Sequence, residues 1–195
     1  MKSVPILLYI PNLIGYIRLC LLGFAWYYFS QPSIFLPLYI IQVLLDGIDG
    51  WTARRFNQVS KFGAWFDVVI DNIGRGILWT RISSIGILIT SIEWITFVAL
   101  NSHGSEWKSK LSSSNDLIVR NIMKNGFQTL FGFLTIVLGI HCLPIVIYII
   151  RYEALFDRSS FLLHHIKTIC IIGRLFSLYC EIYVIHLFIK EDLLK

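Results

Sequence analysis

The sequence predicts an all-α integral membrane protein with a single domain over residues 1–195. The chain is 56% hydrophobic and only 15% charged, whereas a soluble domain carries about 25% charged residues. Its mean hydropathy is +0.69, and apolar stretches long enough to cross a bilayer recur along its whole length. This composition excludes an ordinary soluble domain and leaves no room for a second domain.

Six transmembrane helices can be placed from the length of the apolar stretches, since a helix needs about 20 apolar residues to cross a bilayer. A short interfacial helix can precede Pro11, and the turn at 30–33 separates the first two spans. A polar segment from Asn101 to Asn125 separates the fourth span from the fifth. The predicted spans are 12–29, 34–53, 63–82, 84–101, 127–150 and 160–189.

Loop charges predict the orientation of these spans. With six spans, both termini share one side with the loops 54–62 and 102–126. That side carries ten Lys or Arg residues against three on the other. The positive-inside rule then places the termini and the 54–62 loop in the cytosol. The ten cations are Lys2, Arg54, Arg55, Lys61, Lys108, Lys110, Arg120, Lys124, Lys190 and Lys195, and the three are Arg81, Arg151 and Arg158.

The overall basic charge does not indicate nucleic acid as a partner. The pI is near 9.1, but the cations are scattered through a membrane chain, so anionic lipid surfaces and phosphate-bearing substrates explain them better. The four cysteines lie in apolar stretches without metal-ligand spacing, and we expect small buried side chains rather than disulfides or ligands. They are Cys20, Cys142, Cys170 and Cys180.

Four carboxylates stand at helical spacing within the apolar sequence. Asp46 and Asp49 are three residues apart, and Asp67 and Asp71 are four apart, so each pair lies on one face of its own helix. A charge at membrane depth costs roughly 2.5–3.5 kcal/mol on insertion scales, and like charges also repel. Hard divalent cations are the natural neutralising partners, and two metals about 3.5–4 Å apart would suit phosphate chemistry.

The same residues carry a family resemblance. The pattern Asp-x2-Asp-Gly-x2-Ala-Arg, eight residues, Gly-x3-Asp-x3-Asp runs from Asp46 to Asp71. It resembles the signature of the class-I CDP-alcohol phosphatidyltransferases at all eight fixed positions. The stretch Pro11-Asn12-Leu13-Ile14-Gly15-Tyr16-Ile17-Arg18 is similar to the start of eukaryotic phosphatidylinositol synthases. The resemblance is specific over roughly residues 5–75.

This resemblance implies an enzyme of phospholipid biosynthesis in the endoplasmic reticulum membrane. Such an enzyme moves a phosphatidyl group from CDP-diacylglycerol to an alcohol, inositol first, and releases CMP with the help of Mg²⁺ or Mn²⁺. By analogy, Asp46, Asp49 and Asp67 would hold the metals. Asp71 would take the proton from the attacking alcohol as general base, and it would also be a metal ligand.

Other residues of the motif are candidates for binding the substrate, each with a structural alternative. Gly50, Ala53 and Gly63 would let a flat nucleotide approach the backbone, or form a small-residue seam for helix packing. Arg54 fits a phosphate or cytidine contact. Two further residues have evenly balanced alternatives: Ser60 binds the nucleotide or caps the third span, and Asn12 contacts the nucleotide or terminates the interfacial helix.

The chain departs from the phosphatidylinositol synthase pattern in the part of the family that receives the acceptor. Asn72 stands where the family has an Arg. The run Glu93-Trp94-Ile95-Thr96-Phe97-Val98 replaces an Asp followed by Ser-His-Trp, and Val119-Arg120-Asn121-Ile122-Met123 replaces Leu-Arg with tyrosines. The acceptor therefore stays open, with inositol first and glycerol phosphate or an amino alcohol second, and the chain could be a diverged paralogue that uses another alcohol or has little activity.

Two other classes of function stay open. A catalytically weak relative acting as a membrane scaffold or lipid-binding protein would have had no reason to keep four costly charges. A cation transporter explains the carboxylates but not the Gly50-Ala53-Arg54 block. The sequence leaves a homodimer open. Further charges within the spans are functional candidates or pair among themselves: Arg18, Arg75, Glu93, Lys167, Arg174 and Glu181.

Overall fold

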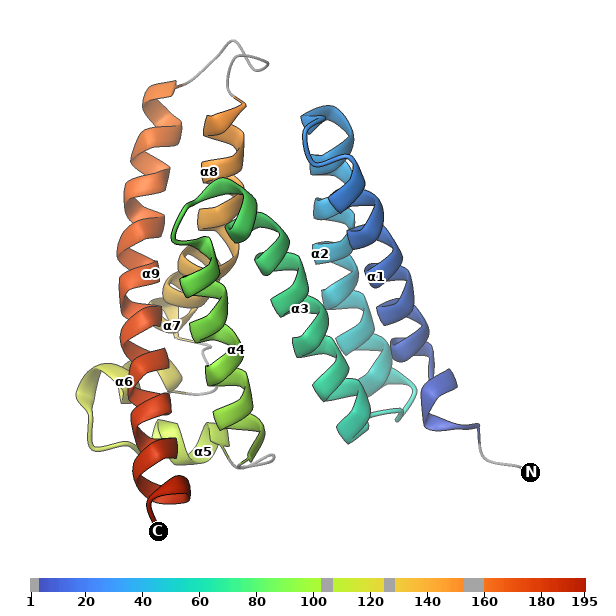
Figure 1. Ribbon diagram of the computed structural model, residues 1–195. Coiled ribbons are helices and arrows are strands. Elements are labelled where there is room, and N and C mark those ends of the chain that lie inside the picture. Colours follow the sequence, from blue (N-terminus) through green and yellow to red (C-terminus); the bar gives the residue numbers. More distant parts are fainter. Residues whose placement is uncertain (1–3, 103–106, 125–128, 153–159) are drawn as a thin grey trace. The chain divides into compact units, whose positions relative to one another are not determined.

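The computed structural model describes residues 4–102, 107–124, 129–152 and 160–195, and these residues form helices and no strands (Figure 1). The chain divides within α3 into two compact units, Met1–Ile77 and Leu78–Lys195. The helices are η1 (Ile6–Leu8), α1 (Ile10–Tyr27), α2 (Pro32–Arg55), α3 (Lys61–Ile82), α4 (Gly86–Ser102), α5 (Trp107–Ser112), α6 (Leu117–Met123), α7 (Leu130–Phe133), η3 (Leu134–Cys142), α8 (Leu143–Arg151), α9 (Ser160–Phe188) and η5 (Ile189–Leu193).

The first unit consists of η1, α1, α2 and most of α3, and α1 lies along α2 (Figure 1). A proline stands in the first turn of both α1 and α2, where its missing N–H leaves no hydrogen bond unmade. The residues that α1 buries recur every three or four positions, so one face of the helix points inward. They are Pro11, Asn12, Gly15, Arg18, Leu22 and Ala25. The one charged side chain on this inward face is that of Arg18.

Gly15 brings α3 close to that face. A Cβ atom at this position would lie 2.6 Å from the ring of Phe66, which real side chains do not tolerate. The ring of Phe66 also packs against that of Tyr16, with centroids 5.2 Å apart. The absence of a side chain at Gly15 therefore allows the acidic face of α3 to lie next to α1.

The second unit is built around α9, which α4, α8 and η3 contact along its length (Figure 1). The helices η3 and α9 meet backbone to backbone. A Cβ atom on Gly139 would lie 2.4 Å from the carbonyl carbon of Gly173 and 2.5 Å from the nitrogen of Arg174. Small residues that allow such an approach are typical of helix packing in membranes.

We expect Gly139→Leu to destabilise the protein because the new side chain must displace backbone atoms of α9. Overpacking of this kind costs about 1–3 kcal/mol or more, so thermal unfolding of the purified protein in detergent should begin at lower temperature. Gly23→Leu is the matched control, because a Cβ at Gly23 meets nothing within 4 Å. Equal melting temperatures for the two variants would contradict the close packing of η3 on α9.

The polar segment between the fourth and fifth predicted spans contains two short helices, α5 and α6, which the sequence did not predict. They pack on α4 and α9 through a buried apolar cluster of Ala99, Leu111, Val119, Met123 and Val184. Polar groups fasten the same segment, since the hydroxyl groups of Ser114 and Tyr183 lie 2.7 Å apart. Tertiary contacts with α9 thus order a segment whose composition resembles that of a loop.

Asp116 caps α6 outside the predicted spans. The hydroxyl of Tyr179 donates a hydrogen bond to its Oδ2 at 2.6 Å, and the backbone N–H of Val119 donates to its Oδ1 at 2.9 Å. Both bonds favour the ionised form, and they hold the pKa of Asp116 below its usual value. The stabilisation from this cap is present at neutral pH and is lost as the pH falls through that lowered pKa.

The structure confirms an all-α chain with helices that are long and apolar enough to cross a membrane. Each predicted span coincides with helical residues, and the ends that lie within the described residues differ by at most three positions. The predicted start of the fifth span, at 127, lies outside the described residues. Within the described residues, four helices are long and apolar enough to cross a bilayer, and Gly86–Ser102 is a shorter apolar helix. The number of six spans stays a prediction, because α3 carries the charges of Asp67, Asp71 and Arg75. The four are Ile10–Tyr27, Pro32–Arg55, Leu130–Arg151 and Phe161–Leu193.

The cysteines are all free thiols. Cys170 is buried as expected, and Cys142 and Cys180 are partly buried. The expectation of burial is wrong for Cys20, which is exposed on α1. This thiol lies on the face of α1 opposite to its buried charged face, where an apolar side chain can contact lipid.

Candidate metal centre

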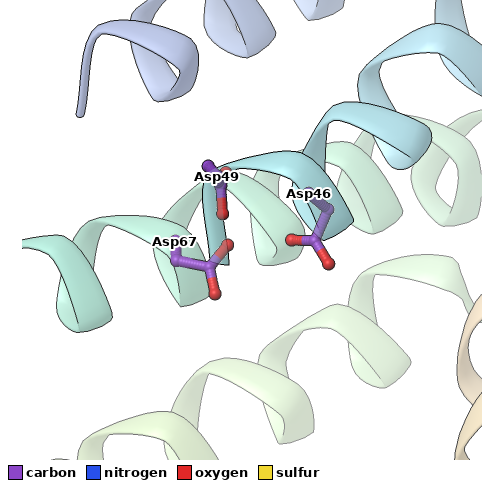
Figure 2. Close-up of side chains that lie close together, drawn as sticks. All are labelled: Asp46, Asp49 and Asp67. Atoms are coloured by element: carbon purple, nitrogen blue, oxygen red, sulfur yellow. The ribbon is translucent and has the colours of Figure 1, made fainter. Parts of the chain in front are cut away.

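Three carboxylates from two helices of the first unit converge on one point. Asp46 and Asp49 come from α2 and Asp67 comes from α3, and one oxygen of each lies within 4.8 Å of the others. Figure 2 shows the three side chains directed toward one another from the two helices. The side chain of Asp49 is 10% exposed, whereas those of Asp46 and Asp67 keep 42% and 43% exposure, so the cluster can be reached from solvent.

The turn between α2 and α3 sets the alignment of these carboxylates. Asn57 has a φ of 58°, a left-handed conformation that asparagine tolerates better than most residues, and the chain reverses there after α2 ends. The side chain of Gln58 accepts a hydrogen bond from the backbone N–H of Ile10 at 2.9 Å, which ties the turn to the start of α1. The sequence spacing alone gives each pair a common face, and this turn makes the two faces meet.

Arg18 of α1 contacts all four carboxylates of the motif. Its side chain is fully buried, and its amino nitrogens lie 2.8 Å from Asp46, 2.6 Å from Asp49, 2.7 Å from Asp67 and 2.7 Å from Asp71. The sequence indicated Arg18 only as one of several charges within the spans and did not assign it to the site. One feature of the sequence could have indicated its role: Arg18 is the sole charged residue of the first predicted span, and it ends the Pro11–Arg18 stretch.

Asp71 lies one turn beyond Asp67 and is outside the group of three converging carboxylates. Its Oδ1 is bound by Arg18, and its Oδ2 lies 3.5 Å from Arg75. Arg75 also donates a hydrogen bond to Asn72. These contacts orient the carboxylate of Asp71 toward the same centre through Arg18.

The donor set suits a hard divalent cation. All the converging ligand atoms are carboxylate oxygens, the type that Mg²⁺, Mn²⁺ and Ca²⁺ prefer. Two guanidinium groups, those of Arg18 and Arg75, face four carboxylates, so the formal negative charge is only partly balanced. In addition, Asp46 Oδ1 is buried and accepts no hydrogen bond, although it lies 2.8 Å from Arg18. A bound cation would satisfy both the charge and this oxygen.

The small residues of the motif lie beside this cluster on α2. A Cβ atom on Gly50 would lie 3.5 Å from the guanidinium of Arg54, so the Arg54 side chain folds back over Gly50. Arg54 is exposed, and Ala53 is partly buried. The structure therefore brings Gly50 and Arg54 together at the accessible end of α2, next to the carboxylates.

Three further candidate residues meet where α1 and α3 begin. A Cβ atom on Gly63 would lie 3.1 Å both from Asn12 Oδ1 and from Ser60 Oγ. The backbone N–H of Gly63 donates to Ser60 Oγ at 3.0 Å, and Asn12 Nδ2 donates to the carbonyl of Ile6 at 2.6 Å. Ser60 thus caps α3 and Asn12 holds the end of η1, the structural alternative that the sequence offered for each. Binding of a nucleotide by these residues stays a prediction.

A second group of buried charges lies in the second unit. Arg174 is 2.9 Å from Glu181 and 3.6 Å from Glu93, and all three side chains are buried. The alternative that charges within the spans pair among themselves therefore holds for this trio. Glu93 belongs to one of the departures noted in the sequence, and its carboxylate is engaged by α9.

The family model for CDP-alcohol phosphatidyltransferases matches residues 8–181. CDP-diacylglycerol–inositol 3-phosphatidyltransferase 1 of Arabidopsis thaliana is 37% identical over 113 residues, 57% of this chain and 48% of that protein. CDP-diacylglycerol–inositol 3-phosphatidyltransferase of Saccharomyces cerevisiae is 43% identical over 67 residues, which are 34% of this chain and 30% of that protein. The protein of the same name from Rattus norvegicus is 28% identical over 132 residues, which are 62% of each chain. No solved structure matches significantly.

The aligned segment spans about half the length of the first of these relatives. The family match, however, extends from the start of α1 into α9. It therefore includes the four carboxylates, Arg18 and both compact units. The chain belongs to the CDP-alcohol phosphatidyltransferase family.

Proposed function

We propose that this protein is a metal-dependent enzyme that transfers a phosphatidyl group from CDP-diacylglycerol to inositol and releases CMP. The observation that carries the proposal is the convergence of Asp46, Asp49 and Asp67 on one accessible point, with Asp71 one turn away. The family match and the names of the relatives support the donor and the acceptor.

The reaction exchanges CMP for an alcohol at a phosphorus atom. Divalent cations held by Asp46, Asp49 and Asp67 would neutralise diphosphate oxygens of the donor. The partial exposure of Asp46 and Asp67 leaves these carboxylates open to a substrate that arrives from the aqueous end of α2. Asp49 is the least exposed of the three and would hold the cations from the interior of the protein.

Asp71 is the group that we propose as general base. Its carboxylate lies 3.5 Å from Arg75 and, in this metal-free arrangement, 2.7 Å from Arg18, and its side chain is 26% exposed. A base must lie within hydrogen-bond reach of the proton that it removes. A hydroxyl approaching the centre from the side of Asp71 would meet this carboxylate one helical turn from Asp67, one of the residues that would hold the cations.

Gly50 and Arg54 would receive the nucleotide end of the donor. The Arg54 guanidinium already lies over Gly50, and it is exposed. A planar guanidinium binds phosphate oxygens in pairs and also stacks on flat rings. Ala53, Ser60, Gly63 and Asn12 would complete the nucleotide side of the site.

We expect Gly50→Leu to weaken binding of CDP-diacylglycerol because a branched side chain would fill the space over which the nucleotide must lie. An increase in KM of about tenfold corresponds to about 1.4 kcal/mol, with a smaller change in kcat. Gly47→Leu is the matched control on the same helix, since a Cβ at Gly47 meets nothing within 4 Å. Equal KM values for the two variants would remove Gly50 from the donor site.

The decisive experiment measures CMP release by the purified full chain with CDP-diacylglycerol, Mg²⁺ or Mn²⁺, and a panel of labelled alcohols. The proposal predicts a labelled lipid from inositol and a slower reaction, or none, with glycerol phosphate or amino alcohols. Transfer to another alcohol would retain the donor half of the proposal and reject inositol. Failure with every alcohol, in a protein shown to be folded, would reject the transferase.

We further propose six spans in the endoplasmic reticulum membrane, with both termini and the opening of the acidic cluster in the cytosol. The support is the excess of cations on the side of the 54–62 and 102–126 segments. Soluble inositol and divalent cations would then have access to the site from the cytosol.

Cysteine labelling in sealed vesicles tests this topology. In a variant without native cysteines, Lys124→Cys should react with a membrane-impermeant thiol reagent from the cytosolic side. Ser84→Cys should react only after the vesicles are opened, because it lies between α3 and α4. Both positions are exposed, so each provides the control for the other. The opposite labelling pattern would refute the cytosolic site.

A further inference from the structure

The guanidinium of Arg18 lies at the point on which the carboxylates converge. One amino nitrogen, NH1, contacts Asp49 of α2 and Asp67 of α3. The other, NH2, contacts Asp46 of α2 and Asp71 of α3. Each nitrogen therefore bridges the two acidic helices, and all four distances lie between 2.6 and 2.8 Å.

This position cannot be shared with a metal ion. Oxygen ligands lie about 2.0–2.1 Å from Mg²⁺ and about 2.3–2.6 Å from Ca²⁺. An ion centred where the guanidinium lies would meet the oxygens that Arg18 now contacts, Asp46 Oδ1, Asp49 Oδ2 and Asp67 Oδ1, and the two cations would also repel each other at contact distance. A cation bound by Asp46, Asp49 and Asp67 together must therefore displace the guanidinium from its present contacts.

The surroundings of Arg18 do not satisfy every polar group of the ion-pair cluster. The side chain is fully buried, yet its Nε makes no hydrogen bond, and its 2.8 Å contact with Asp46 Oδ1 is an ion pair without hydrogen-bond geometry. A buried polar atom without a partner costs about 1–3 kcal/mol. The arrangement is therefore one that neutralises the carboxylates without satisfying every group, as expected of a counter-ion that can be exchanged.

We propose that Arg18 is a built-in counter-ion that competes with divalent cations for the four carboxylates and so sets the metal affinity of the site. This inference rests on the metal site of the proposed function. Without metal, the guanidinium keeps Asp46, Asp49, Asp67 and Asp71 from repelling one another. With metal, it must leave, and the cost of moving it is subtracted from the binding free energy of the ion.

The test measures Mn²⁺ binding and thermal stability of the purified full chain in detergent, with free Mn²⁺ followed by paramagnetic resonance. Arg18→Met keeps an apolar stem and removes the charge. It should bind Mn²⁺ about tenfold more tightly than the wild-type chain, which lies within the range by which one bound group usually changes the affinity for another. In the presence of a chelator, the same variant should melt at lower temperature, and Mn²⁺ should raise its melting temperature more than that of the wild type.

Arg75→Met separates competition from a general charge effect. Arg75 is also close to Asp71, at 3.5 Å, and it donates a hydrogen bond to Asn72 on its own helix. Its loss removes the same charge without vacating the centre, so the gain in Mn²⁺ affinity should be clearly smaller. Arg18→Lys retains a charge that cannot bridge four carboxylates, and it should bind Mn²⁺ with intermediate affinity even if the Met variant does not fold.

The outcomes distinguish this inference from the proposed function. Weaker or unchanged Mn²⁺ binding in Arg18→Met and Arg18→Lys would overturn the competition, as would an equal gain in Arg75→Met. If neither the wild-type chain nor any variant binds Mn²⁺, both the competition and the metal site are overturned. Tighter Mn²⁺ binding in the Arg18 variants without CMP release by the wild-type chain would support the competition and reject the transferase alone.

Discussion

Replacing Asp49 with Asn should abolish most Mn²⁺ binding and reduce CMP release by about 10²–10³-fold, the size expected when one electrostatic stabiliser of the transition state is lost. Asp49 is the most buried of the three converging carboxylates, so water cannot easily replace its oxygen. Asn keeps the shape of the side chain but removes the charge. Asp46→Asn and Asp67→Asn should act in the same direction, with metal affinity and activity falling together.

Asp116→Asn is the matched control for these variants. Asp116 is a carboxylate at the start of α6 with no part in the cluster, and asparagine is an equally good residue to cap a helix. Its metal affinity and turnover should equal those of the wild type. The metal site would be abandoned if Asp46→Asn, Asp49→Asn and Asp67→Asn all kept wild-type turnover at limiting Mg²⁺.

Asp71→Asn should reduce turnover by about 10²–10⁴-fold, the usual contribution of a general base, while most of the binding of CDP-diacylglycerol is retained. The reason is geometric. Asp71 lies one helical turn from Asp67 and outside the group of three converging carboxylates, so its loss removes a proton acceptor and leaves the diphosphate site in place. Turnover, donor binding and Mn²⁺ binding must be measured on the same variant.

These measurements assign the role of Asp71. If donor binding and activity fall together, the residue serves metal or substrate binding rather than proton transfer. If the variant binds and turns over normally, another group takes the proton. Asp71→Glu gives a useful comparison, because a longer carboxylate that restores part of the turnover would indicate a base whose position is critical.

The sequence predicted the helices and the acidic residues for simple physical reasons. A bilayer requires about 20 apolar residues per crossing, so the spans could be placed within three residues of the observed helices. Residues three or four apart share a helix face, so Asp46 with Asp49, and Asp67 with Asp71, could be assigned to common faces. These properties depend only on residues that are close together in the sequence, so the sequence alone is enough to predict them.

The short helices α5 and α6 could not be predicted in this way. Their segment is polar and contains no apolar stretch of membrane length. The helices are stabilised by burial of Leu111 and Val119 against α9 and by the hydrogen bond between Asp116 and Tyr179. These partners are more than 60 residues apart in the sequence, and no local pattern relates them.

What the sequence by itself determined is the membrane class, the spacing of the four carboxylates and the family to which that spacing is similar. Only the tertiary structure decided that Gly15 lets α3 approach α1, that Gly139 meets Gly173, and that Arg18 reaches all four carboxylates from a different helix. The physical reason is that helix periodicity determines which residues share a face. Which faces meet depends on close packing and charge pairing between segments that are distant in the chain.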